Sequence, residues 1–303
     1  GAIAKSLLET TKAEIWILDC DESRLHSTLL GFSEKANIQV SSYLMDIKDP
    51  YSVAAALDAS RPDMLIHAAA LKHVPVLEAQ TREGYMTNVI GTSNVLAALK
   101  DTEIDNFVFI STDKAAYPAN YLGKTKLVGE LLTAGIDGTS NVKGNPITTS
   151  VVRFGNVFLS RGSVLETFIH QIKTNSAITL TNPDMERFFI DLEEASKIIL
   201  KLMSSSLSGI SILDMGPPVK LVDLINRLQN YFQVSLPVTI IGTKEGEKLH
   251  ENLLTDFEKS VSTKFDLFEN IKFSKVLSLD KIKGSSLPRN DGEAKVLIQE
   301  LLQ

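Results

Sequence analysis

Asp113 and Lys114 place a carboxyl group beside an amine, directly after Thr112 and the apolar segment 106–110. Such a segment is typical of a buried strand, and open α/β sheets place ligands and acid/base groups at the carboxyl ends of their strands. The pair, together with Thr112, is therefore the predicted catalytic core. The alternative is an ordinary Asp-Lys pair in a solvated turn, which the strand-end position disfavours.

Alternating strand and helix patterns run through the first half of the chain. Strands are predicted at residues 14–19, 38–46, 64–67 and 106–112, and helices at residues 5–10 and 83–99. This alternation predicts an α/β fold with a doubly wound parallel sheet of the Rossmann type in residues 1–150. After residue 150 the predicted strands and helices become shorter and alternate less regularly. This change predicts a smaller substrate-binding lobe over residues 151–303, interleaved with the first domain. Residues 283–291 are expected to be a loose segment.

Length and composition exclude several classes of protein. The 303 residues, 44% of them hydrophobic, can bury a sizeable core. A formal net charge of -6 argues against general electrostatic binding to nucleic acid or to an anionic membrane. The single cysteine excludes an internal disulfide framework, and the five histidines show no metal-ligand spacing. No apolar run approaches the roughly 20 residues of a membrane span, and no signal peptide opens the chain. We expect a cytoplasmic protein without a metal site.

The start of the chain bears on dinucleotide binding. A Rossmann fold binds pyrophosphate where a first strand and a glycine-rich turn meet a helix N-terminus, but here Gly1, Ala2 and Ile3 lead directly into the first predicted helix. The first strand is therefore expected to be missing from this chain. Asp19, at a strand end, suits the acidic residue that binds the adenosine ribose. Its alternative role is to cap the next helix.

Eight further segments carry a resemblance to one family. They are residues 67–75, 88–92, 111–115, 152–157, 160–164, 183–188, 213–220 and 245–249. In this order, and over residues 1–254, they resemble the nucleotide-sugar 4,6-dehydratases of capsule and flagellin-glycan synthesis, within the extended short-chain dehydrogenase/reductases. The resemblance implies a homo-oligomer that binds a UDP-sugar.

The resemblance also implies a reaction. A hydride leaves C4 of the sugar for a nicotinamide and returns to C6, and the transient C4 ketone acidifies the C5 hydrogen. Lys114 suits the base that removes the C5 proton, and Asp113 suits the acid that protonates the departing 6-hydroxyl, if the site holds the amine neutral and the carboxyl protonated. The implied activity is that of a UDP-N-acetylglucosamine 4,6-dehydratase, with inversion at C5 left open.

One position departs from the usual dehydrogenase pattern. A tyrosine normally stands four residues before the helical lysine, on the same helix face, but the residue four before Lys126 is Leu122. Some members of the dehydratase family also carry an apolar residue there. The C4 hydroxyl proton must then go to Thr112, Asp113 or water, and Thr112 with Asp113 is the favoured path. Tyr121, one position off, is expected to pack or to border the site.

The resemblance implies binding residues as well. Lys126 should reach the nicotinamide ribose with support from Asn88, and Asp46 should flank the adenine. The further cofactor positions are Gly1, Ile3, Asp19, Ile47, Ala68 and Ala69. The expected substrate contacts are Lys72, Asn156, Arg161, Arg187 and Glu247, the arginines because a guanidinium matches phosphate with paired donors. The alternative for any one arginine is a surface ion pair.

The sequence leaves alternatives open for both the cofactor and the class of reaction. Asp19 favours NAD, because a carboxylate would repel the 2′-phosphate of NADP and no arginine adjoins it before Arg24. The family uses both forms, so NADP stays an alternative. Two other functions also stay open: a sugar-nucleotide 4- or 5-epimerase that keeps the 6-hydroxyl, and a nucleotide-binding sensor without activity.

Overall fold

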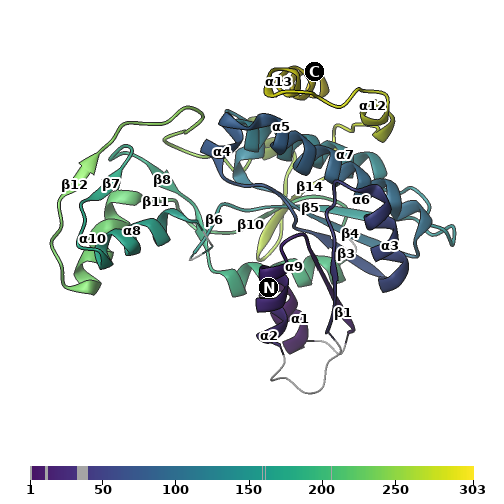
Figure 1. Ribbon diagram of the computed structural model, residues 1–303, viewed down its shortest axis with the longest axis horizontal. Helices are drawn as coiled ribbons and strands as arrows, with labels where there is room; N and C mark the ends of the chain where they lie inside the picture. The colour runs from purple at the N-terminus through teal and green to yellow at the C-terminus, as the bar shows by residue number, and fades with distance from the viewer. Residues whose placement is uncertain (1, 11–12, 33–39, 159, 161, 206) are drawn as a thin grey trace.

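The computed structural model describes residues 2–10, 13–32, 40–158, 160, 162–205 and 207–303 (Figure 1). The elements up to residue 153 are α1 (Ala2–Thr10), β1 (Ile15–Asp19), α2 (Glu22–Leu30), β2 (Val40–Leu44), α3 (Pro50–Ser60), β3 (Met64–His67), α4 (Val74–Ala79), α5 (Thr81–Gly84), η1 (Tyr85–Gly91), α6 (Thr92–Ala98), η2 (Leu99–Asp101), β4 (Asn106–Ile110), η3 (Asp113–Ala115), α7 (Tyr121–Ile136) and β5 (Thr148–Arg153). The four predicted strands are confirmed, with ends that differ by a few residues where the structure describes them; residues 38 and 39 of the second predicted strand lie outside the described residues. The first described element is a helix, as expected.

The second half alternates shorter elements. They are β6 (Asn156–Val157), α8 (Val164–Lys173), β7 (Ile178–Leu180), β8 (Glu186–Arg187), β9 (Phe189–Ile190), α9 (Leu192–Ser204), β10 (Gly209–Leu213), β11 (Val219–Lys220), α10 (Leu221–Phe232), β12 (Val238–Ile240), α11 (Asp256–Val261), β13 (Thr263–Lys264), β14 (Phe268–Ile271), α12 (Leu279–Lys283) and α13 (Asp291–Leu301). The segment predicted to be loose is confirmed between the last two helices. Every helix in the described ranges is too short or too polar to span a bilayer.

A six-stranded sheet forms the centre of the molecule, in the order β13-β14-β10-β5-β4-β3. The strands β3, β4, β5 and β10 run parallel, whereas β14 pairs antiparallel with both β10 and β13. A separate two-stranded parallel sheet joins β1 to β2. The predicted Rossmann-like α/β fold is confirmed, and the antiparallel edge is an addition that the sequence did not predict.

Strand β4 shows how the sequence builds two cores. Successive side chains of a strand point to opposite faces, so Phe107 and Phe109 pack with Leu132 of α7 in one core, and Val108 packs with Ile198 of α9 in the other. Both faces are covered, which is why this segment is apolar throughout. Figure 1 shows α7 and α9 on opposite sides of the sheet.

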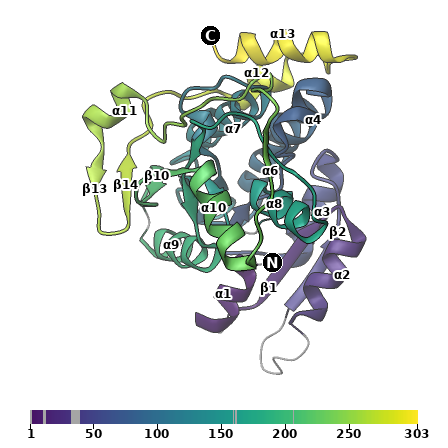
Figure 2. The same ribbon diagram turned by 90° about the vertical axis from the view of Figure 1, so that its left-hand side faces the viewer.

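Part of the second half of the chain forms a smaller body beside the sheet. A third core joins α8, β7 and α10 through Phe168, Ile178 and Ile225, and Figure 1 shows these elements on the left, away from the sheet. Figure 2 views the molecule from that side, with α10 and α8 toward the reader. Because β10 and β14 return to the central sheet, the two halves of the chain interleave. The division at residue 150 stays a prediction.

The helix predicted over residues 83–99 contains a π-helical segment. It runs as α5, then η1 with π-helical hydrogen bonding, then α6. Asn88 lies inside η1 and is buried. A π-helical turn places an extra residue in the helix and is often found at functional sites, and this one packs against α7.

Candidate active site

The catalytic turn, defined here as residues 111–115, follows the carboxyl end of β4. Ser111 N donates to Val152 O at 2.8 Å, and Asp113 N donates to Phe154 O at 3.1 Å, so the main chain stays bonded to the neighbouring segment. The Thr112 side chain then caps η3 by accepting from Lys114 N. The sequence placed this pair at a strand end of the sheet, and the structure confirms that position.

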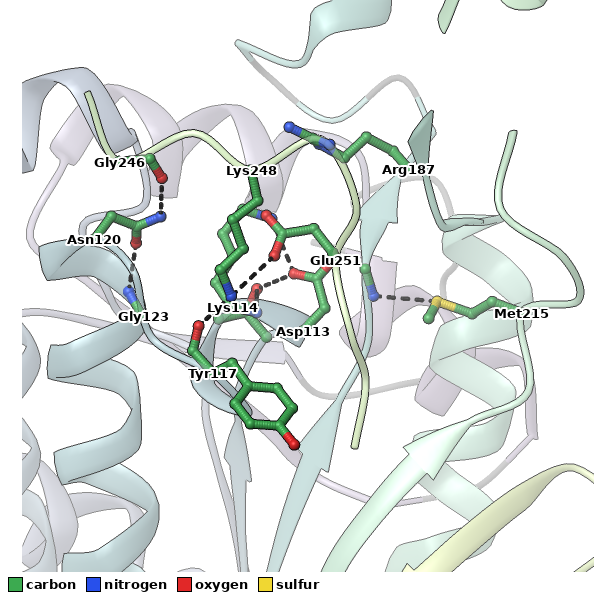
Figure 3. A network of polar contacts seen from close by, with 12 residues as sticks. Asp113, Lys114, Tyr117, Asn120, Gly123, Arg187, Met215, Gly246, Lys248 and Glu251 are labelled. Atoms are coloured by element: carbon green, nitrogen blue, oxygen red, sulfur yellow. Dashed lines mark hydrogen bonds and ion pairs between the residues drawn. The ribbon is translucent and has the colours of Figure 1, made fainter. Parts of the chain in front are cut away.

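Asp113 is fully buried and accepts two donors on one oxygen. Its Oδ1 accepts from Thr112 Oγ1 at 2.8 Å and from Lys114 Nζ at 2.9 Å (Figure 3). Its Oδ2 is buried and has no hydrogen-bond partner among the described residues. One carboxyl oxygen can accept both donors while the other carries a proton, so the acid role that the sequence analysis gives to Asp113 stays a prediction.

A glycine keeps the space beside Asp113 open. A Cβ atom added to Gly155 would lie 2.8 Å from Phe188 O and 3.3 Å from Asp113 Oδ2. Because Phe188 Cβ and the backbone oxygen Phe188 O both lie at 2.8 Å, a larger residue would force the chain to move. Gly155 N donates to Met215 Sδ at 3.1 Å, and this hydrogen bond holds the backbone of Gly155 in place beside Asp113 (Figure 3).

Glu251 is a site residue that the sequence reasoning missed. Its side chain is 2% exposed, and its Oε1 lies 3.6 Å from Lys114 Nζ. Burial raises the pKa of the Glu251 carboxyl; Lys114 opposes that rise and Asp113 adds to it. A signal was present, because Glu251 follows by two residues the segment 245–249 that carried the family resemblance.

The crossing segment, defined as residues 245–251, brings Glu251 over the catalytic turn. Asn120 Nδ2 donates to Gly246 O at 2.9 Å, while its Oδ1 accepts from Gly123 N at 2.8 Å. Gly246 has φ of +78°, and an added Cβ would lie 2.8 Å from Asn120 Cβ, so glycine is required there. Lys248 Nζ donates to Tyr117 O (Figure 3).

Lys126 lies on the buried face of α7. It is 6% exposed, and its Nζ lies 4.1 Å from the centroid of the Phe109 ring. Burial lowers the pKa of Lys126 to about 7, and Glu130 opposes that shift. Leu122, at the position of the usual tyrosine, is buried on the same helix, so the described chain offers no phenol one helical turn before this lysine.

Asn88 holds the loop after β3 against α7. Its Oδ1 accepts from Leu71 N at 2.8 Å, and its Nδ2 donates to Leu71 O at 3.0 Å and to Thr125 Oγ1 at 3.1 Å. The side chain is therefore occupied by protein contacts. Thr125 directly precedes Lys126, so the support that Asn88 gives to this lysine is indirect.

The acidic cofactor candidates lie at or just beyond the carboxyl ends of β1 and β2. Asp19 ends β1, and its Oδ1 accepts from Asp21 N at 3.0 Å. Arg24 Nη1 lies 3.6 Å from Asp19 Oδ2. The helix α2 brings Arg24 back to Asp19, which weakens the argument for NAD, and the choice of NAD stays a prediction. Asp46 Oδ1 accepts from Lys48 N at 2.9 Å.

The other cofactor candidates differ in exposure. Ala68 and Ala69 follow β3 and are exposed. Ile47 packs against the main core, where a Cβ on Gly91 would meet its side chain at 2.6 Å. Ile3 packs against the core that contains α9. Gly1 lies outside the described residues.

Arg187 is the substrate candidate that contacts the crossing segment. It is 8% exposed, and its Nη1 donates to Glu186 O at 2.6 Å and to Leu249 O at 3.2 Å. Its charge acts on Glu251, and Figure 3 shows it close to the crossing segment. Arg187 therefore holds this segment in place, in addition to any contact with a phosphate.

The remaining substrate candidates are more dispersed. Asn156 is half-buried in β6, and Lys72 is exposed, although partial desolvation of its amine lowers its pKa. Glu247 Oε2 accepts from Lys244 N at 2.9 Å, so this side chain closes a turn at the surface. Arg161 lies outside the described residues.

A buried ion network underlies the catalytic turn. Arg153, 1% exposed, donates to Glu130 from Nε at 2.8 Å and from Nη2 at 2.6 Å. Its Nη1 donates to both carboxylate oxygens of Glu258, at 2.9 and 3.0 Å. Ser111 Oγ donates to Glu130 Oε1 at 2.5 Å. The network thus ties β5, α7 and α11 to the start of the turn. Among the described side chains, no three His, Cys, Asp or Glu are placed to hold a metal ion.

Comparisons with known proteins address the family. The polysaccharide biosynthesis protein family matches residues 1–272. The capsular polysaccharide biosynthesis protein CapD of Staphylococcus aureus is 36% identical over 73% of this chain, which spans only 37% of that protein. A UDP-glucose 4-epimerase of Rickettsia canadensis is 34% identical over 80% of this chain and 69% of its own.

A solved structure resembles the whole chain. The X-ray structure of Pen from Bacillus thuringiensis has a TM-score of 0.80 and 28% sequence identity, and the match covers 100% of this chain and 95% of that one. The resemblance found in the sequence is thereby confirmed. With the fold and the strand-end site, these matches show that the chain belongs to the polysaccharide biosynthesis family of nucleotide-sugar dehydratases and epimerases.

Proposed function

We propose that this protein is a UDP-N-acetylglucosamine 4,6-dehydratase. The observation that supports this most directly is the buried cluster in which Asp113 Oδ1 accepts from both Thr112 Oγ1 and Lys114 Nζ. A dehydratase needs a base for C5 and an acid for the 6-hydroxyl, and this cluster supplies an amine and a carboxyl group at one strand end. A simple 4-epimerase needs no base at C5.

The residues of the chain fit a nicotinamide cofactor at two points. Asp19, at the carboxyl end of β1, is suited to bind the adenosine ribose. Lys126, buried on α7, is suited to bind the nicotinamide ribose. When bound, the cofactor supplies hydride transfer from C4 and back to C6. NAD is the proposed form and NADP the alternative, since Arg24 beside Asp19 offers a positive charge to a 2′-phosphate.

The geometry supports a proton path without a phenol. Thr112 accepts the proton of the C4 hydroxyl and passes its own to Asp113, along the 2.8 Å hydrogen bond between them. Asp113 becomes the acid in this way and then protonates the departing 6-hydroxyl. Lys114 takes the C5 proton and later returns it. One proton thus moves from O4 to the water that leaves, and the carboxylate is regenerated.

Mass spectrometry after incubation of the full-length protein with UDP-N-acetylglucosamine tests the proposal. The expected product is lighter by one water, with no net accumulation of reduced cofactor, because the hydride is borrowed and returned. An isobaric product would reject the dehydratase in favour of an epimerase, which the Rickettsia relative brings into consideration. Binding of the sugar nucleotide without turnover would reject both enzyme activities and would favour a nucleotide-binding sensor. The mass of the cofactor released on denaturation distinguishes NAD from NADP.

A further inference from the structure

Glu251 is a buried carboxyl group that the proposed reaction has not yet used. Its Oε1 lies 3.6 Å from Lys114 Nζ, and its Oε2 makes no hydrogen bond in the described part of the chain and lies 4.0 Å from Lys248 Nζ (Figure 3). Two more charged groups act on it, Asp113 from η3 and Arg187 from β8. Lys114 therefore lies within 4 Å of two separate carboxyl groups.

This arrangement raises the question of where the ammonium proton of Lys114 goes. Lys114 can take a proton from C5 only as a free amine, and its Nζ lies 2.9 Å from Asp113 Oδ1 and 3.6 Å from Glu251 Oε1. Direct loss to solvent is hindered, because the Lys114 side chain is 16% exposed. A proton acceptor inside the site is required.

We propose that Glu251 receives the ammonium proton of Lys114, which leaves Lys114 as the free amine that takes the C5 proton; this inference rests on the proposed function. One N–H bond breaks at Nζ and one O–H bond forms on Glu251. The transfer follows protonation of Asp113 by the C4 hydroxyl, since one of the two anions beside the ammonium is then neutral. When Lys114 has returned a proton to C5, Glu251 gives its proton back.

Burial and flexibility both favour this transfer. The Glu251 carboxyl has a 2% exposed side chain, and removal from water stabilises the neutral, protonated form of a carboxyl group. The distance of 3.6 Å is longer than a hydrogen bond, but the lysine side chain has four rotatable carbons and closes such a gap by small torsional changes.

A pH series on Glu251→Gln tests the transfer. Single turnover of UDP-N-acetylglucosamine in D2O is followed by deuterium incorporation at C5, and C4 oxidation is followed by transient cofactor absorbance. In the wild type the C5 step should be flat from about pH 6 to about pH 8, because the proton moves within the pair. In Glu251→Gln it should be about 10²-fold slower at about pH 6 and rise about tenfold per pH unit, because Lys114 must then lose its proton to solvent. The absorbance transient should be retained.

Two further variants complete the experiment. Glu186→Gln is the control: it removes a carboxylate that lies 2.9 Å from His250, the residue that precedes Glu251, and that forms no ion pair with Lys114. This variant should match the wild type. Glu251→Asp keeps a carboxyl group and should restore the flat profile; if Glu251→Gln does not fold, a rising profile in Glu251→Asp overturns the proposal.

Other outcomes also overturn it. A C5 step in Glu251→Gln that is as fast as in the wild type at neutral pH would make Glu251 a plain counter-ion, and an equal loss at every pH with weakened binding of UDP would make it an anchor for the crossing segment. Failure of the wild type itself to release water would instead reject the proposed function, so the two failures are distinguishable.

Discussion

Arg153 and Glu130 form a bidentate ion pair beneath the catalytic turn, with donor to acceptor distances of 2.8 and 2.6 Å. Both side chains are 2% exposed. A pair buried to this extent is costly to break, because removal of one partner leaves the other charge without compensation.

We predict that Arg153→Met lowers the free energy of unfolding by about 3–5 kcal/mol, since it leaves Glu130 and Glu258 buried without their cation. Urea titration of the purified variant measures this loss. Arg289→Met is the matched control, because Arg289 pairs with Glu293 at the surface, where its own side chain is 86% exposed, and such pairs contribute about 0–1 kcal/mol. Equal stability of the two variants would contradict the prediction.

Lys114→Met and Asp113→Asn should each lower turnover at least about 10²-fold, the usual loss when an acid/base group is removed. The dissociation constant for UDP should change little, because neither side chain needs to hold the nucleotide. Stopped-flow turnover and calorimetric titration with UDP separate these effects. Lys259→Met, an exposed lysine on α11, serves as the control. Near-full activity in both variants would remove the cluster from the mechanism.

Thr112→Val should slow C4 oxidation strongly, because valine keeps the shape of threonine but cannot relay the hydroxyl proton to Asp113. Leu122→Met should be nearly silent, since both side chains are apolar and similar in volume. Tyr121→Phe should also be mild. Single-turnover absorbance of the reduced cofactor is the measurement. If Tyr121→Phe loses the transient and Thr112→Val keeps it, a tyrosine is the base and the relay is absent.

His67 should make stability depend on pH. It is 4% exposed, with Nε2 2.9 Å from Thr92 Oγ1, and burial lowers its pKa to about 3, with Lys126 acting in the same direction. The unfolded chain, whose histidine has a pKa of about 6.5, therefore binds more protons in this window. The free energy of unfolding should fall by up to about 1.4 kcal/mol per unit as the pH drops below about 6.5.

His67→Gln isolates that contribution, because glutamine can still donate to Thr92 but does not titrate. Denaturant titrations of both proteins at pH values from about 7.5 to about 5 compare the slopes. The wild type should lose more stability than His67→Gln over this range. Parallel curves would show that His67 has the same pKa in the folded and the unfolded chain, and would contradict the prediction.

Local sequence patterns predicted the catalytic turn but not its surroundings. The position of Asp113 and Lys114 followed from an apolar strand and a turn within a few residues, which periodicity reveals. Arg24 reaches Asp19 only because α2 folds back over the strand end. Their separation of five positions in the sequence did not reveal that the two side chains lie close together. The π-helical segment around Asn88 was missed because the apolar spacing over residues 83–99 was interpreted as one regular α-helix.

Buried charges were the other source of error. Charged residues are expected at the surface, so Glu130, Arg153 and Glu258 carried no sequence signal until the fold brought them together. Glu251 was missed for a related reason. Its contact with Lys114 depends on the path of the crossing segment through space, and no local pattern specifies that path.

The crossing segment has a consequence for how the site is assembled in time. Its contacts join residues 126 and 131 positions apart, between Asn120 and Gly246 and between Tyr117 and Lys248. Closing loops of this length is slow compared with forming helices and neighbouring strand pairs. During synthesis, the catalytic turn must emerge well before the residues that cover it. Enzymatic competence should therefore be among the last properties that the folding chain acquires, after most of its helical circular dichroism has returned.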